Sequence, residues 1–168
     1  MELRHDKLLI RNAERADARQ LAAWWNDGTV MAHAGFPLGL GITAEEIAAS
    51  LEKDGDGTGR RLMLLWDGAP IGEMSYRILA DGAAEIGIKI CETAYQEKGI
   101  GSTALTLLIR ALFDRGCGKI VLDTNLNNLR AQHVYEKLGF RKTAVRRNAW
   151  RDQLGRLQSA VDYELTPE

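Results

Sequence analysis

Gln96-Glu97-Lys98-Gly99-Ile100-Gly101 is the most informative segment of this chain. Before it, Ile86, Ile88 and Ile90 alternate as in a strand, and after it apolar residues recur at helical spacing. Glycine at 99 and 101 removes two Cβ atoms and allows close approach to the backbone. The following helix would begin with unpaired amides and a partial positive charge, which suit a pyrophosphate. The pattern therefore predicts either a phosphate-binding loop or a tight strand–helix turn without a ligand.

Two better-known phosphate loops are absent from this segment. The Walker pattern GxxxxGK[ST] does not occur, and GxGxxG lacks its third glycine because position 104 is Ala. The site also lies in mid-chain. An unrelated nucleotide-binding domain nevertheless stays open as one interpretation.

Strand-like and helix-like segments alternate along the rest of the chain, which predicts an α/β layer architecture in one domain, residues 1–168. Asp17 is expected to cap the first helix, and Thr43-Ala44-Glu45-Glu46 has the spacing of a capping box. Asp67-Gly68-Ala69-Pro70 predicts a hairpin. Strands are expected at 8–11, 61–66, 71–77, 84–91, 119–124, 140–150 and 157–165, and helices at 17–26, 43–53, 100–116 and 128–138.

Composition excludes several classes of protein. With 45% hydrophobic and 27% charged residues, the chain has the composition of a globular protein. The net charge of -1 and the lack of a basic stripe argue against a nucleic-acid partner, and Arg141 to Arg147 is interpreted as a solvated strand face. No segment has the length and apolar composition expected of a membrane span. Cys91 and Cys117 form neither a disulfide framework nor a CxxC metal motif. We expect a cytoplasmic protein with no metal and no membrane partner.

A second motif, about thirty residues after the glycine segment, helps to interpret the first. Asn128-Leu129-Arg130-Ala131 is followed by Tyr135-Glu136-Lys137-Leu138-Gly139-Phe140. Together with Gln-x-x-Gly-x-Gly at 96–101, and over nearly the whole chain, this resembles the GNAT acetyltransferase superfamily, in particular the ribosomal-protein N-terminal and polyamine acetyltransferases. The resemblance implies a mixed, mostly antiparallel central sheet of about seven strands with about four flanking helices.

The implied activity is acetyl-CoA-dependent N-acetylation, in which an amine attacks the thioester directly in a ternary complex. Backbone amides near Ile88 and Ile90 would stabilise the oxyanion and pair with pantetheine, on a strand that splays from its neighbour in the family. Asn128 would hold the cofactor, cap its helix, or do both. The implied cofactor-binding residues are Ile88, Ile90, Gln96, Glu97, Lys98, Gly99, Ile100, Gly101, Ser102 and Asn128.

The resemblance also suggests the catalytic residues. Tyr135 matches the family's general acid, although its spacing equally fits a buried aromatic residue. Glu85, fourteen residues before Gly99, is the candidate base; Glu73 and a water chain are the alternatives. Cys91 lacks an evident histidine partner and is interpreted as a small buried residue.

The acceptor is left open. Trp24 and the segment 33–37 fall where the family shapes its acceptor site, and Trp24 is expected to be partly exposed because Trp25 fits the apolar face of its helix. Expected acceptors are a small-molecule amine or a protein N-terminal amine, for a monomer or a homodimer. A non-catalytic acyl-CoA-binding or sensing module on the same fold is the alternative function.

Overall fold

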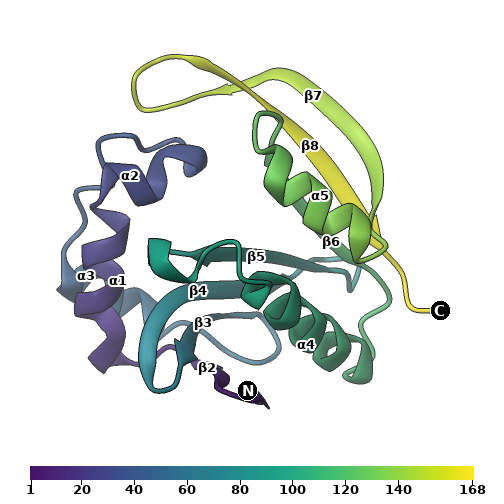
Figure 1. Ribbon diagram of the computed structural model, residues 1–168, viewed down its shortest axis with the longest axis horizontal. Helices are drawn as coiled ribbons and strands as arrows, with labels where there is room; N and C mark the ends of the chain where they lie inside the picture. The colour runs from purple at the N-terminus through teal and green to yellow at the C-terminus, as the bar shows by residue number, and fades with distance from the viewer. The chain divides into compact units, whose positions relative to one another are not determined.

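The computed structural model describes residues 1–168, and their contacts divide the chain into two compact units (Figure 1). The first unit comprises Met1–Ala13, Lys53–Val121 and Leu165–Glu168. The second comprises Glu14–Glu52 and Leu122–Glu164. Each unit therefore combines segments that are far apart in the sequence. The assignment of residues 1–168 to one domain stays a prediction.

The first unit is built on a sheet of antiparallel neighbours followed by one parallel strand. Its strands are β1 (Glu2–His5), β2 (Leu8–Asn12), β3 (Gly59–Trp66), β4 (Ala69–Ile78), β5 (Ala84–Ile90) and the start of β6 (Ile120–Asn125). β6 pairs in parallel with β5, Ala84 with Ile120 and Glu85 with Val121. The predicted β3–β4 hairpin is confirmed: Asp67 and Gly68 both have positive φ, as a two-residue type I′ turn requires.

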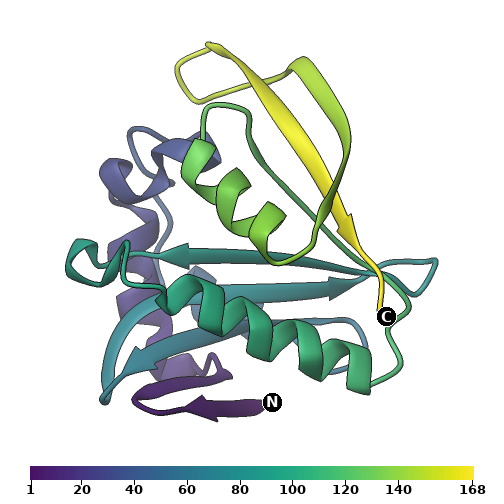
Figure 2. The ribbon, with the colours of Figure 1, turned by 45° about the vertical axis from the view of Figure 1, so that its right-hand side comes forward.

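Helix α4 (Ile100–Asp114) packs against this sheet and contacts β5, β1 and β2 (Figure 2). Its start and end were predicted, and Gly116, with φ +93, follows it in the left-handed conformation. The predicted apolar face was partly wrong, because Leu107 and Ala111 are only half-buried. The buried residues of the helix are Ile100, Ala104, Leu105, Leu108, Ile109 and Leu112.

The helices of the second unit correct two expectations about the segment 14–26. The helices are η1 (Arg15–Asp17), α1 (Ala18–Trp25), α2 (Gly28–Met31), η2 (Ala32–Ala34), α3 (Ala44–Leu51) and α5 (Leu129–Lys137), and α1 packs on α3. Asp17 does not cap α1: its carboxylate accepts a hydrogen bond from Glu14 N (2.7 Å) in the preceding turn. Trp24 is buried, at 4% exposure, and Trp25 is half-buried, because the core follows Leu21 and Trp24 at a spacing of three. At α3, the predicted cap is confirmed: the Thr43 hydroxyl accepts from Glu46 N.

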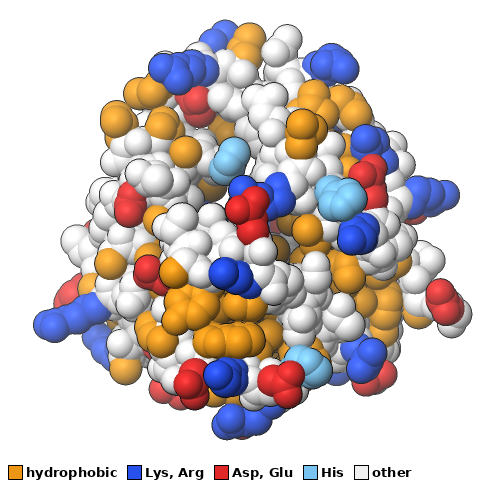
Figure 3. Space-filling model, in the orientation of Figure 1, with side chains coloured by type: hydrophobic (Ala, Val, Ile, Leu, Met, Phe, Trp, Pro, Cys, Tyr) orange, Lys and Arg blue, Asp and Glu red, His pale blue; other side chains and the backbone are white.

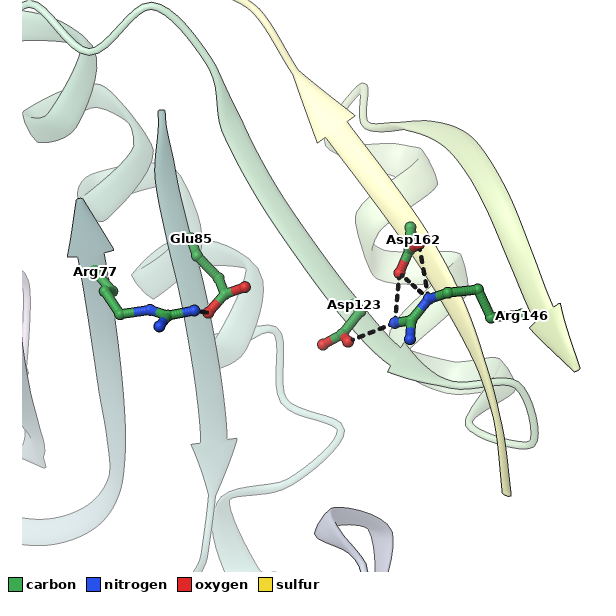
Figure 4. A network of polar contacts seen from close by, with 5 residues as sticks. All are labelled: Arg77, Glu85, Asp123, Arg146 and Asp162. Carbon is green, nitrogen blue, oxygen red and sulfur yellow. Dashed lines mark hydrogen bonds and ion pairs between the residues drawn. The ribbon is translucent and has the colours of Figure 1, made fainter. Parts of the chain in front are cut away.

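The remaining strands of the second unit are β7 (Arg141–Arg151) and β8 (Leu157–Leu165), which form a long antiparallel hairpin. β7 is exposed almost throughout, as expected for Arg141 to Arg147. Arg146 lies between two carboxylates of neighbouring strands, Asp123 at 3.0 Å and Asp162 at 2.9 Å (Figure 4). Arg146 is thus neutralised by partners within the unit, and Arg141 and Lys142 pair with Glu164 and Glu136.

The strand order is β1-β2-β3-β4-β5-β6-β8-β7, and β6 contributes residues to both units. This confirms the predicted mixed, mostly antiparallel sheet, with eight strands where about seven were expected. The additional strand is β1, which is largely exposed and therefore carries no apolar alternation in the sequence. None of the helices combines the length and apolar character needed to span a membrane.

Candidate functional site

The start of α4 is the centre of the candidate site. Its first intrahelical bond runs from Thr103 N to Gly99 O (3.2 Å), so the amides of Ile100, Gly101 and Ser102 have no acceptor within the helix. No side chain caps this end. The side chains of Lys98 and Ser102 also make no hydrogen bond or ion pair within the chain. Several donors and the positive end of a fifteen-residue helix are therefore available to one anion.

The two glycines of this segment are not required by packing. A Cβ at Gly99 would meet no atom within 4 Å, and one at Gly101 would only touch Ile88 Cδ1 at 3.9 Å. Backbone conformation does favour glycine at position 99, because its φ is +78. Gly101 has helical geometry, where alanine is ordinarily preferred. The missing side chain at 101 is thus explained by neither packing nor conformation within the chain.

The segment before α4 is shaped by its own contacts. η3 (Thr93–Tyr95) turns the chain after β5, and Gln96 Nε2 donates to Ile90 O at 2.9 Å. Glu97 adopts a positive φ of 58, which is uncommon for a residue with a side chain. Gln96 therefore ties the segment back to the end of β5, and its predicted contact with a cofactor stays a prediction.

Backbone direction along β5 supports a role for Ile88 and Ile90. Ala84 N donates to Lys119 O on the β6 side, whereas Cys91 N donates to Ile71 O beside β4. Because amide direction alternates along a strand, the amides of Ile88 and Ile90 point to the same side as that of Ala84, away from β4. Their predicted roles towards pantetheine and the oxyanion are compatible with this direction and stay predictions.

The two candidate bases lie near opposite ends of the β4–β5 pair. Glu85 is at its start, where its carboxylate accepts from Arg77 Nη2 at 2.8 Å and its side chain is 46% exposed (Figure 4). Five residues separate it from Ile90, roughly 17 Å along a strand. Glu73 on β4 is opposite Lys89, next to the end of β5 that leads into the glycine segment. Closeness to the glycine segment is closeness to the predicted pyrophosphate site and not to the thioester, so the register assigns the base to neither carboxylate, and both stay predictions.

Helix α5 carries the two candidates of the second unit. Asn128 is its N-cap: Asn128 Oδ1 accepts from Ala131 N at 3.2 Å. That half of the expectation is confirmed, and the side-chain Nδ2 is left without a partner. Gln132 was missed by sequence reasoning, although it is buried and its Nε2 donates to Leu126 O at 2.9 Å. The only sequence signal was a polar residue three positions before Tyr135.

Tyr135 is buried in a small aromatic cluster within the second unit. Its ring meets Phe140 and Tyr163 edge-to-face, with centroid distances of 5.9 and 5.8 Å. Its hydroxyl makes no hydrogen bond within the chain. Burial, with smaller contributions from Asp123 and Tyr163, raises the pKa of Tyr135 to about 12. Contacts of the aromatic ring therefore hold Tyr135 in place, and its hydroxyl stays protonated at any ordinary pH.

Cys91 does not have the surroundings of a nucleophile. Burial first, and then the carboxylate of Glu73, raise the pKa of the Cys91 thiol. All three histidines are exposed, and Figure 3 shows histidine side chains at the surface among interspersed basic and acidic ones. Cys91 is thus a buried, protonated residue, as expected. No group of three or more His, Cys, Asp or Glu residues is arranged to hold a metal ion.

Comparison with known proteins agrees with this geometry. Residues 7–141 match the family model described as the acetyltransferase (GNAT) domain. The chain belongs to the GNAT acetyltransferase family. The segment 96–101 and the whole of α5 lie within the matched region.

Curated relatives match over part of their length. The [Ribosomal protein bS18]-alanine N-acetyltransferase of Escherichia coli is 32% identical over 85 residues, covering 51% of this chain and 57% of that protein. N-alpha-acetyltransferase 30 of Dictyostelium discoideum is 34% identical over 55 residues, covering 33% of this chain and 30% of that protein. The chain thus spans between about a third and somewhat over half of these two relatives.

Solved structures share the fold over nearly the whole chain. The spermidine N-acetyltransferase of Vibrio cholerae, in complex with CoA and spermine, has a TM-score of 0.85 at 23% identity and covers 96% of both chains. A ribosomal L7/L12 alpha-N-protein acetyltransferase in complex with coenzyme A has a TM-score of 0.86 at 17% identity, covering 99% of this chain and 98% of that chain. At these identities the likeness establishes the GNAT fold.

Proposed function

We propose that this chain is an acetyl-CoA-dependent N-acetyltransferase that moves an acetyl group to a primary amine by direct attack on the thioester. The observation that carries the proposal is the uncapped start of α4, with three unpaired amides and an unexplained glycine at 101. Family membership supports it, as do the structural relatives described with coenzyme A.

In this proposal the pyrophosphate of the cofactor binds the amides at the start of α4. Lys98 and Ser102 add a charge and a hydroxyl that are not used elsewhere in the chain. The amides of Ile88 and Ile90 pair with pantetheine, and Asn128 Nδ2 contributes a further donor. These groups bind and orient the thioester, which is worth several kcal/mol of the barrier in a two-substrate reaction.

The amine must lose a proton before it attacks, since an alkyl ammonium has a pKa of about 10. Glu85 is the expected base and Glu73 its alternative; the two lie near opposite ends of the β4–β5 pair, and a variant of each decides between them. A carboxylate near the thioester, or a water held by it, accepts this proton. A protonated Cys91 beside Glu73 supports transfer without a covalent acyl-enzyme.

Tyr135 is proposed to act on the leaving sulfur. Its pKa of about 12 keeps the phenol protonated, so it can donate a hydrogen bond as negative charge develops on the thiolate. A thiol has a pKa of about 8.5, so full transfer of the phenol proton is uphill in the resting protein. We therefore expect Tyr135 to act mainly by stabilising the developing charge.

The direct test is acetyl-CoA turnover with a panel of amines, monitored by thiol release. The panel includes protein N-terminal peptides, polyamines and amino acids, with Glu73→Gln and Glu85→Gln compared across pH. We expect turnover with at least one amine, and loss of the acidic limb of the pH–rate profile in only one of the two variants. Acetyl-CoA binding without turnover on any amine would instead identify a non-catalytic acyl-CoA-binding module. The variant that loses the limb identifies the base, and an unchanged limb in both variants would favour a water chain.

A further inference from the structure

The face of the β4–β5 pair that points away from α4 contains a glycine opposite a serine. Ile88 lies on the α4 face, since a Cβ at Gly101 would be 3.9 Å from Ile88 Cδ1. Because side chains alternate along a strand, Gly87 belongs to the opposite face of the sheet. Ser75 is the partner of Gly87 on β4 and shares that face. Both strands lie in the first unit, so this arrangement is complete within one unit.

Gly87 leaves a space that the protein itself does not fill. A Cβ at this position would lie 3.3 Å from Ser75 Oγ and would have no other listed neighbour within 4 Å beyond the adjacent residues of its strand. Its φ is outside the left-handed region, so backbone conformation does not require glycine here. Gly72 on β4 is different, because a Cβ there would lie 2.2 Å from Lys89 O. A glycine inside a strand weakens the sheet and often marks a place where a ligand approaches the backbone closely, and Gly87 fits that description.

The hydroxyl of Ser75 is the uncommitted polar group beside this space. It makes no hydrogen bond within the chain, and the residue is half-buried. A serine hydroxyl can donate one hydrogen bond and accept two. Ser75 Oγ lies over the position where Gly87 has no side chain, so these hydrogen bonds are available to a group bound there.

Charged side chains surround Ser75 on the same face. Glu85 and Lys89 are its diagonal neighbours on β5. Glu73 and Arg77 are two positions away on β4, and Arg77 is paired with Glu85 at 2.8 Å (Figure 4). Diagonal neighbours on one face of a sheet lie about 7–8 Å apart, within reach of long side chains. A group bound at Ser75 is therefore within reach of both candidate bases, among two negative and two positive charges.

This position also adjoins the part of β5 that is proposed to hold the thioester. Ile88 directly follows Gly87, and its amide points away from β4. Ser75 lies on the other side of β5 from the direction of that amide. A molecule that extends from Ser75 towards the Ile88 amide passes over Gly87, where no side chain is in its way.

We infer that the Ser75 hydroxyl and the open position at Gly87 bind the nitrogen of the acceptor amine. This inference rests on the proposed function for its chemistry. An N–H of the amine donates a hydrogen bond to Ser75 Oγ, which directs the nitrogen lone pair at the thioester carbonyl. The proton that leaves the ammonium passes to the carboxylate that serves as base, and nitrogen then forms its bond to the carbonyl carbon. Because every primary amine has this nitrogen, Ser75 serves peptide and polyamine acceptors alike.

The first test compares Ser75→Ala with Ser75→Thr in steady-state kinetics, using the peptides, polyamines and amino acids of the panel. Loss of a hydrogen bond to a charged group corresponds to roughly 10- to 100-fold. We expect Ser75→Ala to lower kcat/KM for the amine by that factor, and by a similar factor for every amine that reacts. The dissociation constant of acetyl-CoA should change less than twofold. Ser75→Thr keeps the hydroxyl and should retain most of the wild-type value.

Gly87→Ala tests the open position independently. Its methyl group would occupy the space beside Ser75 Oγ, so the KM for the amine should rise about tenfold. The Tm should not fall, because alanine is better tolerated than glycine inside a strand. Gly57→Ala is the matched control, since a Cβ at Gly57 meets no atom within 4 Å, and it should change neither quantity.

The outcomes separate this inference from the proposed function. Wild-type turnover that is unchanged in Ser75→Ala, or is lowered equally in Ser75→Ala and Ser75→Thr, overturns the inference and leaves N-acetylation intact. A loss explained by weaker acetyl-CoA binding overturns it as well. Wild-type protein that binds acetyl-CoA but acetylates no amine of the panel refutes the proposed function, and the inference with it.

Discussion

Residues 96–101 at the start of α4 and residues 35–42 after η2 are both rich in glycine, but the surroundings of the glycines differ. A Cβ at Gly39 would lie 2.1 Å from Asn26 O, and one at Gly35 would lie 2.4 Å from the Trp150 ring. At Gly99 and Gly101 the nearest neighbour would be 3.9 Å away or more. One loop needs glycine to pack against its own chain, whereas the other leaves room for something else.

The hydrogen bonds of the two loops differ in the same way. Two side-chain amides, from Asn26 and Gln153, pair in both directions with the backbone of 38–42. At the start of α4 the amides of residues 100–102 have no intrahelical acceptor and no side-chain cap. Glycine in a loop is thus not in itself evidence for a ligand. What distinguishes a binding loop is that its donors and its space are both unused by the protein.

We call residues 35–42 the closed loop and residues 96–101 the open loop. The largest expected effect is on the stability of the protein when the closed loop is altered. Gly39→Ala places a methyl group against Asn26 O and forces alanine to a φ of +79. We expect a loss of about 2–4 kcal/mol in the free energy of unfolding, measured by urea denaturation. Gly41→Ala is the control, because it shares the positive φ but has no neighbour within 4 Å, and it should lose less. Equal losses would show that conformation, not packing, requires these glycines.

The second effect concerns Tyr135, a buried group whose hydroxyl, like the amides of α4, has no partner in the chain. Tyr135→Phe is expected to lower kcat roughly 100-fold, about 2.7 kcal/mol, with the dissociation constant of acetyl-CoA changed less than twofold. An unchanged kcat would reduce Tyr135 to a packing residue.

The same variant has a signature in stability that does not depend on activity. The folded-state pKa of Tyr135, about 12, lies above its unfolded value of 10.0, so its stabilising contribution is complete below pH 10 and is lost as the pH rises towards 12. Tyr135→Phe should therefore flatten the fall in stability across this range. Parallel alkaline curves for the two proteins would contradict the burial argument.

The third effect tests the open loop by the substitution used at Gly39. Gly101→Ala should leave stability unchanged or raise it by up to about 1 kcal/mol, because alanine is favoured in a helix and the methyl group meets no close neighbour. The affinity for acetyl-CoA should fall about tenfold, near 1.4 kcal/mol, measured by calorimetry. Unchanged affinity would mean that the space beside residue 101 is not where the cofactor binds.

The smallest effect is the acid sensitivity of the hairpin tip. Burial acts to raise the pKa of Asp152, but hydrogen bonds from Arg156 N, Gln158 and Leu154 N outweigh it and lower the pKa below 3.8. The stabilising contribution of the carboxylate is therefore present above about pH 4 and is lost as the pH falls below that. Asp152→Asn should show a shallower decline in stability below pH 4, followed by circular dichroism. An identical acid transition would exclude this contribution.

Local patterns predicted the open loop better than the closed one. The glycine segment, α4, the β3–β4 hairpin and the Thr43 cap depend on residues close together in sequence, and each was predicted. The sequence did not predict which face of α1 is buried. Trp24 and Trp25 can each be placed on an apolar face, and only the packing of α1 against α3 decides between them. The pairing of Gln153 with Leu38 spans 115 residues and leaves no local pattern.

The residues of the candidate site also differ in whether local sequence predicts their surroundings. Gly99, Gly101 and Asn128 stand at helix starts that the sequence shows directly. By contrast, the ion pair of Glu85 with Arg77 and the location of Glu73 opposite Lys89 depend on strand register, which a sequence with several alternating segments leaves open.

Thermal unfolding of the purified protein with acetyl-CoA, CoA, ATP and NAD tests the central claim most directly, that the open loop at α4 binds acetyl-CoA. A ligand at 100 times its dissociation constant adds about 2.7 kcal/mol of stability. We predict a clear rise in Tm with acetyl-CoA and CoA, no rise with ATP or NAD, and a reduced rise in Gly101→Ala. A rise with ATP or NAD instead, or no rise at saturating acetyl-CoA, would contradict the assignment of the loop and with it the proposed acetyltransferase activity.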